Sequence, residues 1–351
     1  MSKQASNSSM GQELELLTPM LDHHPYGWSA SFQGLTLRTA LQPIFSISHK
    51  RIVGYEALIR AFDNDNASVL PMHIFQLPAS DPENVLLDRL CRYLHVQNFA
   101  SLTDEVNWLF LNVSPRVVAT GKQRDSFFGQ LLQRTGFPPH RIVVEIVEQP
   151  TDDAELLRET VNYYKELGCL TAIDDFGAGH SNFERIWNLA PDIVKLDRQI
   201  LTRATDDKRA RQILNGIVSL LHQSGCLVLL EGVETREQAM IAIDGGVDFV
   251  QGFFFQRPGL ELEEVIKTVS DFDSLLSDYK ISNQAQLDPT HEITSFFGRL
   301  FMSSVSSLRE GMYFDAACHD LSNHPTVSRC YLINELGVQI EDTLTSEKLV
   351  D

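Results

Sequence analysis

The sequence lacks the features that mark secreted, membrane-spanning or disulfide-stabilised proteins. It has only 5 cysteines in 351 residues, and they lie far apart and form no C-x-x-C pair. This pattern fits a reducing compartment better than a disulfide framework, so we expect the cysteines to be packing residues. Residues 1–30 contain no apolar core of signal-peptide length, and no run approaches the roughly 20 apolar residues of a membrane span. We expect a cytoplasmic protein with no membrane span and with a polar N-terminal arm over residues 1–30.

Positive charge is also scarce. Lys and Arg number 29 against 47 for Asp and Glu, which gives a net charge of −18. Binding to the phosphate backbone of DNA or RNA needs a basic face, so the composition argues against a nucleic-acid polymer as partner. A small anionic substrate would need its own local positive charge.

Short apolar runs with the length and β-branched content of strands are abundant between residues 36 and 257. Helix-like stretches alternate with these runs, which predicts a parallel sheet. About eight strands over about 220 residues match a β/α barrel better than an open sheet. The eight runs cover residues 35–47, 51–59, 107–113, 141–147, 170–176, 192–197, 226–233 and 248–255.

Local signals mark the ends of the intervening helices. Pro82 follows Asp81 at the expected start of a helix, and Thr235 with Gln238 forms a capping-box pattern. Gly168 and Gly225 follow two further helical stretches, where a glycine commonly ends a helix.

Polar residues follow a regular pattern within the eight runs. Each lies at or just beyond the middle of a separate run, except for one adjacent Asp pair. The carboxyl ends of barrel strands meet on one face, where chemistry is built, so these side chains are expected to gather at one mouth. They are Glu56, Asn112, Glu145, Asp174, Asp175, Lys195, Glu231 and Gln251.

Five carboxylates in one mouth require positive charge among them. At about 4 Å and an effective dielectric constant of about 20, each pair of like charges costs on the order of 4 kcal/mol. Carboxylate and amide oxygens, without His or Cys at ligand spacing, favour Mg²⁺ or Mn²⁺ over zinc. Two such ions about 3.5 to 4 Å apart are suited to in-line attack on a phosphodiester. The pair Asp174-Asp175 suits two ions, provided that the strand has already broken into the glycine-containing loop DDFGAGHS.

The motifs resemble those of the EAL family of bacterial cyclic di-GMP phosphodiesterases over essentially all of residues 36–260. Glu56-Ala57-Leu58 matches the tripeptide that names the family, and Arg60 completes E-A-L-x-R. The other motifs follow in order: LQPIF, LNVSP, EIVE, DDFGAG, KLD, EGVE and QGFFFQRP. The resemblance implies a TIM-like β/α barrel over residues 31–262 that hydrolyses cyclic di-GMP to linear pGpG.

The resemblance also implies a role for each matching residue. Asp174, Asp175 and Glu231 would surround the second metal ion. Lys195 would position the attacking water, and Glu231 is the alternative general base. Gln251 would bind the water network of the site. Gln42, Leu58 and Arg60 would contact the substrate, while Glu148 and Glu234 would support loops. The first metal ion would be held by Glu56, Asn112, Glu145 and Asp174. The ions would be Mg²⁺ or Mn²⁺, calcium would inhibit, and the protein would form a homodimer.

Alternative functions remain open at this point. One is a receptor with the same fold that binds cyclic di-GMP without cleaving it, although such members usually lose metal ligands and none is lost here. Another is a nuclease or a glycosidase, since paired acids also serve glycoside cleavage. His180 stands where the family often has Tyr, a departure that would alter loop packing or dimer contacts without touching a metal ligand. No GG-D/E-E-F motif indicates the opposing cyclase activity.

The C-terminal residues 263–351 form a different region. A helix is expected from residue 262, followed by a polar linker, a second helix over residues 293–308 and two strands around Glu335-Leu336-Gly337. This small α+β segment resembles the start of a PAS-like or Cache-like sensor domain and stops before such a domain would normally be complete. A helical dimerisation tail with an edge hairpin is the alternative.

Overall fold

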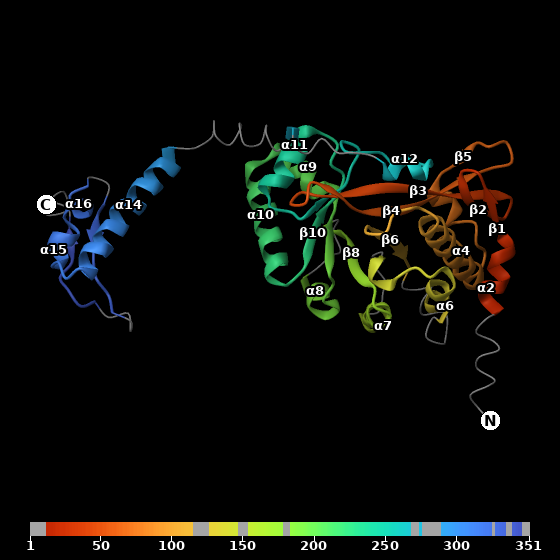
Figure 1. Cartoon of the computed structure of the whole chain (residues 1–351), viewed down its shortest axis with the longest axis horizontal. Helices are drawn as coiled ribbons and strands as arrows, with labels where there is room; N and C mark the ends of the chain where they lie inside the picture. Colours follow the sequence, from red (N-terminus) through yellow and green to blue (C-terminus); the bar gives the residue numbers. More distant parts are fainter. Residues whose placement is uncertain are drawn as a thin grey trace, which may run out of the picture. The chain divides into compact units, whose positions relative to one another are not determined.

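Eight strands of the computed structural model close into a barrel (Figure 1). The eight apolar runs predicted from the sequence are these eight strands, so the β/α barrel is confirmed. In order around the barrel they are β3 (Leu35–Ser46), β11 (Phe249–Val250), β10 (Leu227–Leu230), β9 (Ile193–Leu196), β8 (Leu170–Phe176), β7 (Ile142–Ile146), β6 (Trp108–Val113) and β4 (Arg51–Phe62), which pairs again with β3.

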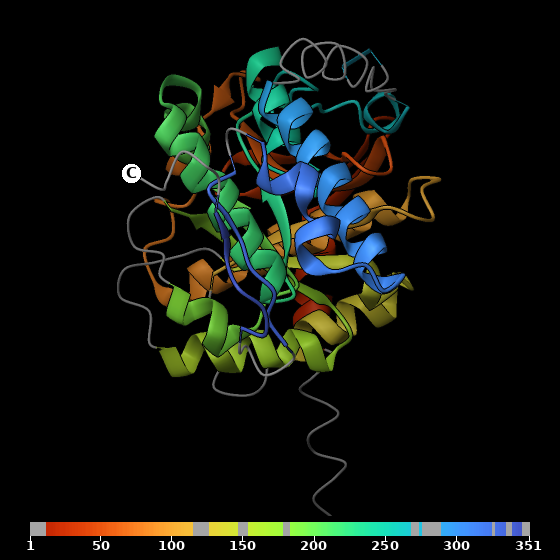
Figure 2. The same cartoon turned by 90° about the vertical axis from the view of Figure 1, so that its left-hand side faces the viewer.

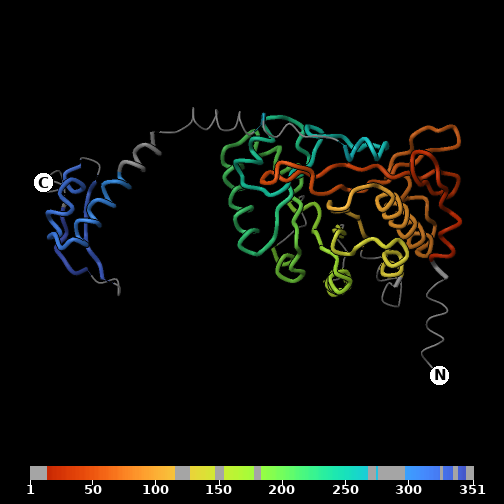
Figure 3. Tube along the Cα trace, viewed as in Figure 1, coloured from red at the N-terminus to blue at the C-terminus, as the bar shows by residue number. Residues whose placement is uncertain are grey.

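Strand β3 runs against the direction of all its neighbours. It pairs antiparallel with both β4 and β11, whereas the other barrel strands pair in parallel. A tight turn after Ser46 returns the chain directly into β4, and such a hairpin can only be antiparallel. The two strands run side by side along their length (Figure 3).

Helices surround the strands, as the helices of residues 154–244 show in Figure 2. The capping box of Thr235 and Gln238 is present, and Gly168 and Gly225 adopt φ of 88° and 83° after their helices. The helices are α4 (Asp81–Ala100), α6 (Ser126–Thr135), α7 (Ala154–Glu166), α8 (Phe183–Leu189), α9 (Arg198–Asp206), α10 (Lys208–Gln223), α11 (Arg236–Asp244) and α12 (Leu262–Ile266), with the short α3 (Pro71–Ile74) and η2 (Pro139–Arg141).

The structure describes residues 12–114, 126–146, 154–177, 183–267, 274–275, 289–324, 327–334 and 339–345. They belong to two units, residues 1–275 and 276–351. No helix among them is long and apolar enough to cross a membrane. All five cysteines are free and buried.

The expectation of a polar arm over residues 1–30 is wrong for residues 12–30. These residues form α2 (Gln12–Leu17), η1 (Thr18–Met20), β1 (Leu21–His24) and most of β2 (Gly27–Phe32), which pairs with β3. Leu14 and Leu17 are buried in the main hydrophobic core. Because α2 has only six residues, its apolar positions show too little periodicity to predict a helix.

The second unit contains α14 (Pro289–Arg309), α15 (Phe314–Ala317), α16 (His319–Ser322), β12 (Arg329–Cys330) and β13 (Leu344–Thr345). Phe314, Cys318 and Cys330 form its small core. The predicted second helix is confirmed, and β12 pairs antiparallel with β13. The predicted turn at residues 335–337 lies outside the described residues, as does most of the helix expected after residue 266. The sensor-domain resemblance stays a prediction.

Candidate functional site

The predicted site residues form a polar layer on top of an apolar layer inside the barrel. The apolar layer consists of Ile44, Phe110, Val143, Ala172, Ile193, Leu229 and Phe249. Alternate residues of a strand point to the same side, so residues two positions further on face the same interior. These are Asn112, Glu145, Asp174, Lys195, Glu231 and Gln251, which the parallel strands present toward their carboxyl ends.

Gln42 joins this layer by the opposite route. Because β3 runs antiparallel to its neighbours, its residue in the polar layer lies two positions before Ile44, whereas on the parallel strands that residue lies two positions after the apolar one. Gln42 pairs in register with Glu56 of β4, so the motif LQPIF and the tripeptide at Glu56 meet across one strand pair.

Lys195 lies at the centre of the polar layer. Its Nζ is 2.6 Å from Glu145 Oε1, 2.7 Å from Glu231 Oε1 and 3.0 Å from Asp174 Oδ1. Glu56 Oε2 lies 4.0 Å from the same atom. One ammonium therefore faces four carboxylates, which come from four different strands or strand ends.

Burial and neighbouring charge shift the pKa values of this cluster. Burial raises the pKa of Glu145 well above its ordinary value, and Lys195 only partly opposes this effect. Burial likewise raises the pKa of Glu231 to about 8, again with Lys195 acting in the opposite direction. For Lys195, burial alone would lower the pKa, but Asp174, Glu145 and Glu231 raise it well above its ordinary value.

A second network orients the amides of the layer. Asn112 Nδ2 donates to Glu56 Oε1 at 3.1 Å, and Gln251 Nε2 donates to Glu56 Oε2 at 2.8 Å. Gln251 Nε2 also lies 3.2 Å from Gln42 Oε1, and Gln42 Nε2 donates to the carbonyl of Gln256 at 3.2 Å. Since Asn112 uses its amino group on Glu56, its carbonyl oxygen is left for another partner.

The adjacent carboxylates of Asp174 and Asp175 reach the same site because the strand is irregular there. Asp175 has φ of 54°, and the pairing of β8 with β9 shifts register between Ile173 and Phe176. The break was expected at the following glycines, but it begins at Asp175, two residues before Gly177 and within the strand itself. Asp174, Asp175 and Glu231 each offer an oxygen, and these atoms lie within 4.8 Å of one another.

The layer fits divalent cations. Glu145 Oε2 and Gln251 Oε1 are enclosed and have no hydrogen-bond partner among the described residues, while Lys195 is the one cation recorded beside the enclosed Glu145 Oε1 and Asp174 Oδ1 in that part of the chain. Lys195 supplies one positive charge against the four acids that face it. Oxygen acceptors without donors, in a site with surplus negative charge, are the environment that Mg²⁺ or Mn²⁺ requires.

The mouth of this layer is a cavity of about 300 Å³ lined by Gln42, Glu56, Asp175, Asp197, Arg198, Glu231, Gly232, Glu234, Gln251, Gly252 and Phe253. Glu234 is at the rim, with Oε1 3.9 Å from Nη1 of the exposed Arg198. Leu58 and Arg60 instead line a neighbouring cavity of about 600 Å³ that also reaches Asn112. Glu148 and His180 lie outside the described residues.

Five residues of the mouth had not been predicted, and three of them carry side chains with a clear local role: Asp197, Arg198 and Phe253. Asp197 accepts from Gln199 N at 2.8 Å and so caps α9, which holds Arg198 at the rim. Phe253 is half-exposed, and the guanidinium carbon of Arg257 lies over its ring, 4.2 Å from the centroid. The motifs KLD and QGFFFQRP contain or adjoin these residues and were the signals that could have identified them.

The family model of the EAL domain matches residues 28–258. The chain belongs to the EAL domain family. The EAL-domain containing protein YkuI of Bacillus subtilis is 28% identical over 287 residues, which cover 77% of this chain and 66% of YkuI. The cyclic di-GMP phosphodiesterase RocR of Pseudomonas aeruginosa is 29% identical over 224 residues, which cover 62% of this chain and 56% of RocR.

Solved structures agree with the barrel of this EAL domain. A standalone EAL protein of Vibrio cholerae, crystallised with cyclic di-GMP, is 29% identical, has a TM-score of 0.57 and is matched over 95% of its length by 66% of this chain. Two further curated relatives are matched over less of their length, 30% and 27%. The chain therefore spans under a third of those two relatives.

Proposed function

We propose that this chain is a phosphodiesterase that hydrolyses cyclic di-GMP to linear pGpG with two divalent metal ions, Mg²⁺ or Mn²⁺. The observation that carries the proposal is the complete polar layer around Lys195, in which each acid and amide expected of an active EAL domain is present. The names of relatives support the substrate: RocR is a cyclic di-GMP phosphodiesterase, and the Vibrio cholerae protein binds cyclic di-GMP.

In the proposed site, Glu56, Asn112, Glu145 and Asp174 hold the first ion, and Asp174, Asp175 and Glu231 hold the second. Bound ions would acidify the attacking water and offset the charge of the phosphate in the transition state. Lys195 orients the three carboxylates that lie within 3.0 Å of it and through them positions the attacking water. Glu231, whose Oε1 lies 2.7 Å from Lys195 Nζ, accepts the proton of that water.

The amide pair Gln42 and Gln251 fixes the orientation of Glu56 and offers Gln251 Oε1 to the site water. Arg60 and Leu58 contact the substrate, and Arg60 supplies positive charge that the acidic chain otherwise lacks. Glu148 and Glu234 support the loops around the mouth.

The direct test is an assay of the purified protein with Mg²⁺ or Mn²⁺ and cyclic di-GMP, with the product identified by chromatography. We expect linear pGpG, and we expect calcium to inhibit. Asp174→Asn should lower turnover by at least about a hundredfold, while the exposed Asp22→Asn should leave it unchanged. Tight binding of cyclic di-GMP without turnover in either ion would instead identify a receptor, and turnover without metal ions would contradict the two-metal mechanism.

A homodimer and a cytoplasmic location complete the proposal. Trp187 of α8 is 76% exposed and Phe183 of the same helix is 38% exposed, beside the loop that follows the Asp pair. A large exposed aromatic side chain on a helix is typical of an interface. Five free, buried cysteines agree with a reducing compartment.

A further inference from the structure

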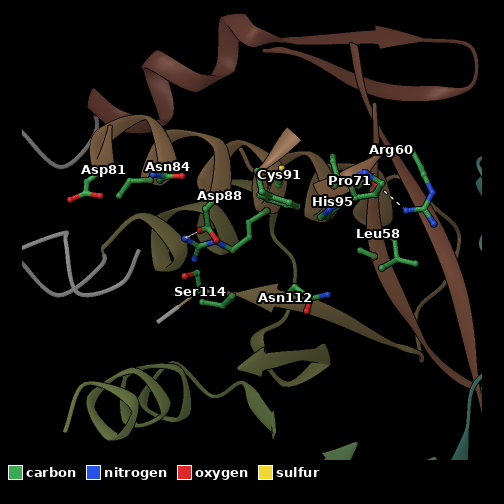
Figure 4. A pocket seen from close by; sticks show the side chains of 16 residues that line it. Leu58, Arg60, Pro71, Asp81, Asn84, Asp88, Cys91, His95, Asn112 and Ser114 are labelled. Atoms are coloured by element: carbon green, nitrogen blue, oxygen red, sulfur yellow. Dashed lines mark hydrogen bonds and ion pairs between the residues drawn. The ribbon is translucent and has the colours of Figure 1, made fainter. Parts of the chain in front are cut away.

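A second cavity arises because β4 is longer than the strand beside it. The parallel pairing of β4 with β6 ends at Glu56 and Phe110, but β4 continues to Phe62 while β6 stops at Val113. The space that remains, about 600 Å³, is bounded by β4, by the end of β6 and by helix α4 (Figure 4).

This cavity adjoins the metal layer. Asn112 lines it and donates to Glu56, which lines the smaller cavity over the acidic cluster. Leu58 and Arg60 follow Glu56 at alternate positions of β4 and line the same space. A ligand that reaches the acidic cluster and is longer than one nucleotide can therefore extend into the cavity beside α4.

His95 is a buried polar residue in the wall of this cavity, on helix α4, and a chain of hydrogen bonds fixes its ring. The chain begins at the backbone of Trp28, whose N–H donates to Asn98 Oδ1 at 2.8 Å and whose carbonyl accepts from Asn98 Nδ2 at 3.0 Å. Both bonds together determine which end of the Asn98 amide is the donor. Asn98 Nδ2 then donates to Thr39 Oγ1 at 3.0 Å.

The next bond determines the tautomer of His95. Thr39 Oγ1 lies 2.9 Å from His95 Nδ1, and in the described part of the chain its hydroxyl has no partner besides Asn98 and His95. Since the hydroxyl accepts from Asn98, its hydrogen points to Nδ1, which becomes the acceptor. Burial, with a smaller effect of Arg60, lowers the pKa of His95 to about 3, so the ring is neutral and its proton is on Nε2.

Nε2–H of His95 is thus a prepared donor. It has no hydrogen-bond partner among the described residues, and the ring lines the cavity at the end where Arg60, Pro71 and Leu58 also lie (Figure 4). Arg60 uses Nη1 on the carbonyl of Ile59 at 2.8 Å, which leaves further guanidinium N–H groups for a ligand. His95 and Arg60 both present hydrogen-bond donors at this end of the cavity. Two donors side by side suit a ligand edge made of acceptors.

We propose that His95 is a specificity-determining residue that donates from Nε2 to the O6 and N7 edge of one guanine of the cyclic dinucleotide. Guanine offers two acceptors on that edge, whereas adenine offers N7 together with an amino donor. A ring whose proton is fixed on Nε2 therefore favours guanine when it faces O6, because adenine places an amino donor at that position. This inference rests on the proposed function, because it concerns the same bound nucleotide.

The test compares binding of cyclic di-GMP and cyclic di-AMP by calorimetry, with calcium as the metal ion. We expect the wild type to prefer cyclic di-GMP. His95→Ala should reduce that preference about tenfold, mainly through weaker binding of cyclic di-GMP. Thr39→Val removes the hydroxyl that fixes the proton of His95 on Nε2, so it should also reduce the preference for cyclic di-GMP. His140→Ala alters an exposed histidine near the start of β7 and should leave the preference unchanged.

A purely structural role for His95 would weaken both ligands equally and leave their ratio intact, which would overturn the proposal. If His95→Ala fails to fold, His95→Gln decides: its amide can donate or accept, so it should retain most of the cyclic di-GMP affinity while binding cyclic di-AMP more tightly. An unchanged ratio in His95→Gln would also contradict us. If the wild type binds no cyclic di-GMP at all, the proposed function itself fails.

Discussion

Lys195 Nζ lies 2.6 Å from Glu145 Oε1, and both side chains are almost completely buried. An ion pair of this kind is costly to break from one side, because the remaining charge stays in a medium of low dielectric constant. In this barrel the acids outnumber the ammonium, so the interior of the mouth depends on positive charge for its stability as well as for chemistry.

The first prediction concerns Lys195→Met. In the presence of a chelator we expect the free energy of unfolding to fall by about 3–5 kcal/mol, because buried carboxylates lose their counter-charge. Added Mg²⁺ should restore part of the loss. Chemical denaturation measures both effects, and Lys267→Met, at a lysine that is 72% exposed, should change stability by less than about 0.5 kcal/mol. Equal effects of the two substitutions would contradict the central role of Lys195.

The second prediction concerns acid stability. The pKa of His95 is lowered from 6.5 to about 3 in the folded protein, so unfolding takes up a proton between these pH values. The stability that neutral His95 contributes is present above pH 6.5 and is lost as the pH falls toward 3, by up to about 1.4 kcal/mol per pH unit. His95→Gln should make this decline shallower in denaturation curves measured at several pH values; an identical decline would show that His95 is not the group.

The third prediction uses two glycines. A Cβ at Gly252 would lie 2.1 Å from the carbonyl oxygen of Val233, so Gly252→Ala should destabilise the protein by about 1–3 kcal/mol or more. It should also lower turnover, because Gln251 is next to it. Gly216 lies in α10, and no other part of the described chain besides its sequence neighbours and its own helix backbone comes within 4 Å of its Cβ position, so Gly216→Ala should stabilise by about 0.5–1 kcal/mol. Thermal unfolding distinguishes the two, and tolerance of alanine at Gly252 would contradict the close approach.

The fourth prediction concerns self-association. Trp187→Ser should shift the protein from dimer to monomer in light scattering at low micromolar concentration, because a large exposed aromatic side chain would be removed from the interface. Val106→Ser, at a 73% exposed residue before β6, serves as the control and should have no effect. A dimer that survives Trp187→Ser places the interface elsewhere.

The strands and the polar layer could be predicted from the sequence because each depends on local pattern. Runs such as residues 141–147 are short and apolar, and each contains, at or just beyond its middle, a polar residue that parallel strands carry to the same end. The barrel then converts a spacing of two residues, as from Ile193 to Lys195, into one shared layer.

The remaining features depend on contacts between distant segments. The chain of hydrogen bonds from Trp28 through Asn98 and Thr39 to His95 joins three separate elements, so no local sequence pattern predicts it. The cavity beside α4 exists because β4 extends beyond the end of β6, and the length of a strand is poorly determined by sequence. The irregularity at Asp175 depends in the same way on pairing with β9.

The reversal of β3 also decides where the barrel is attached to the rest of the chain. Its first residues pair with the last residues of β4, as Thr36 does with Phe62, so the polypeptide enters the barrel on the side of the mouth. It leaves on the same side, where Gly259 exchanges backbone hydrogen bonds of 2.9 and 3.0 Å with Leu41, the neighbour of Gln42. A displacement of the segment before β3 or of the segment after Gly259 would therefore be transmitted through only a few residues to Gln42, one of the amides that orient Glu56.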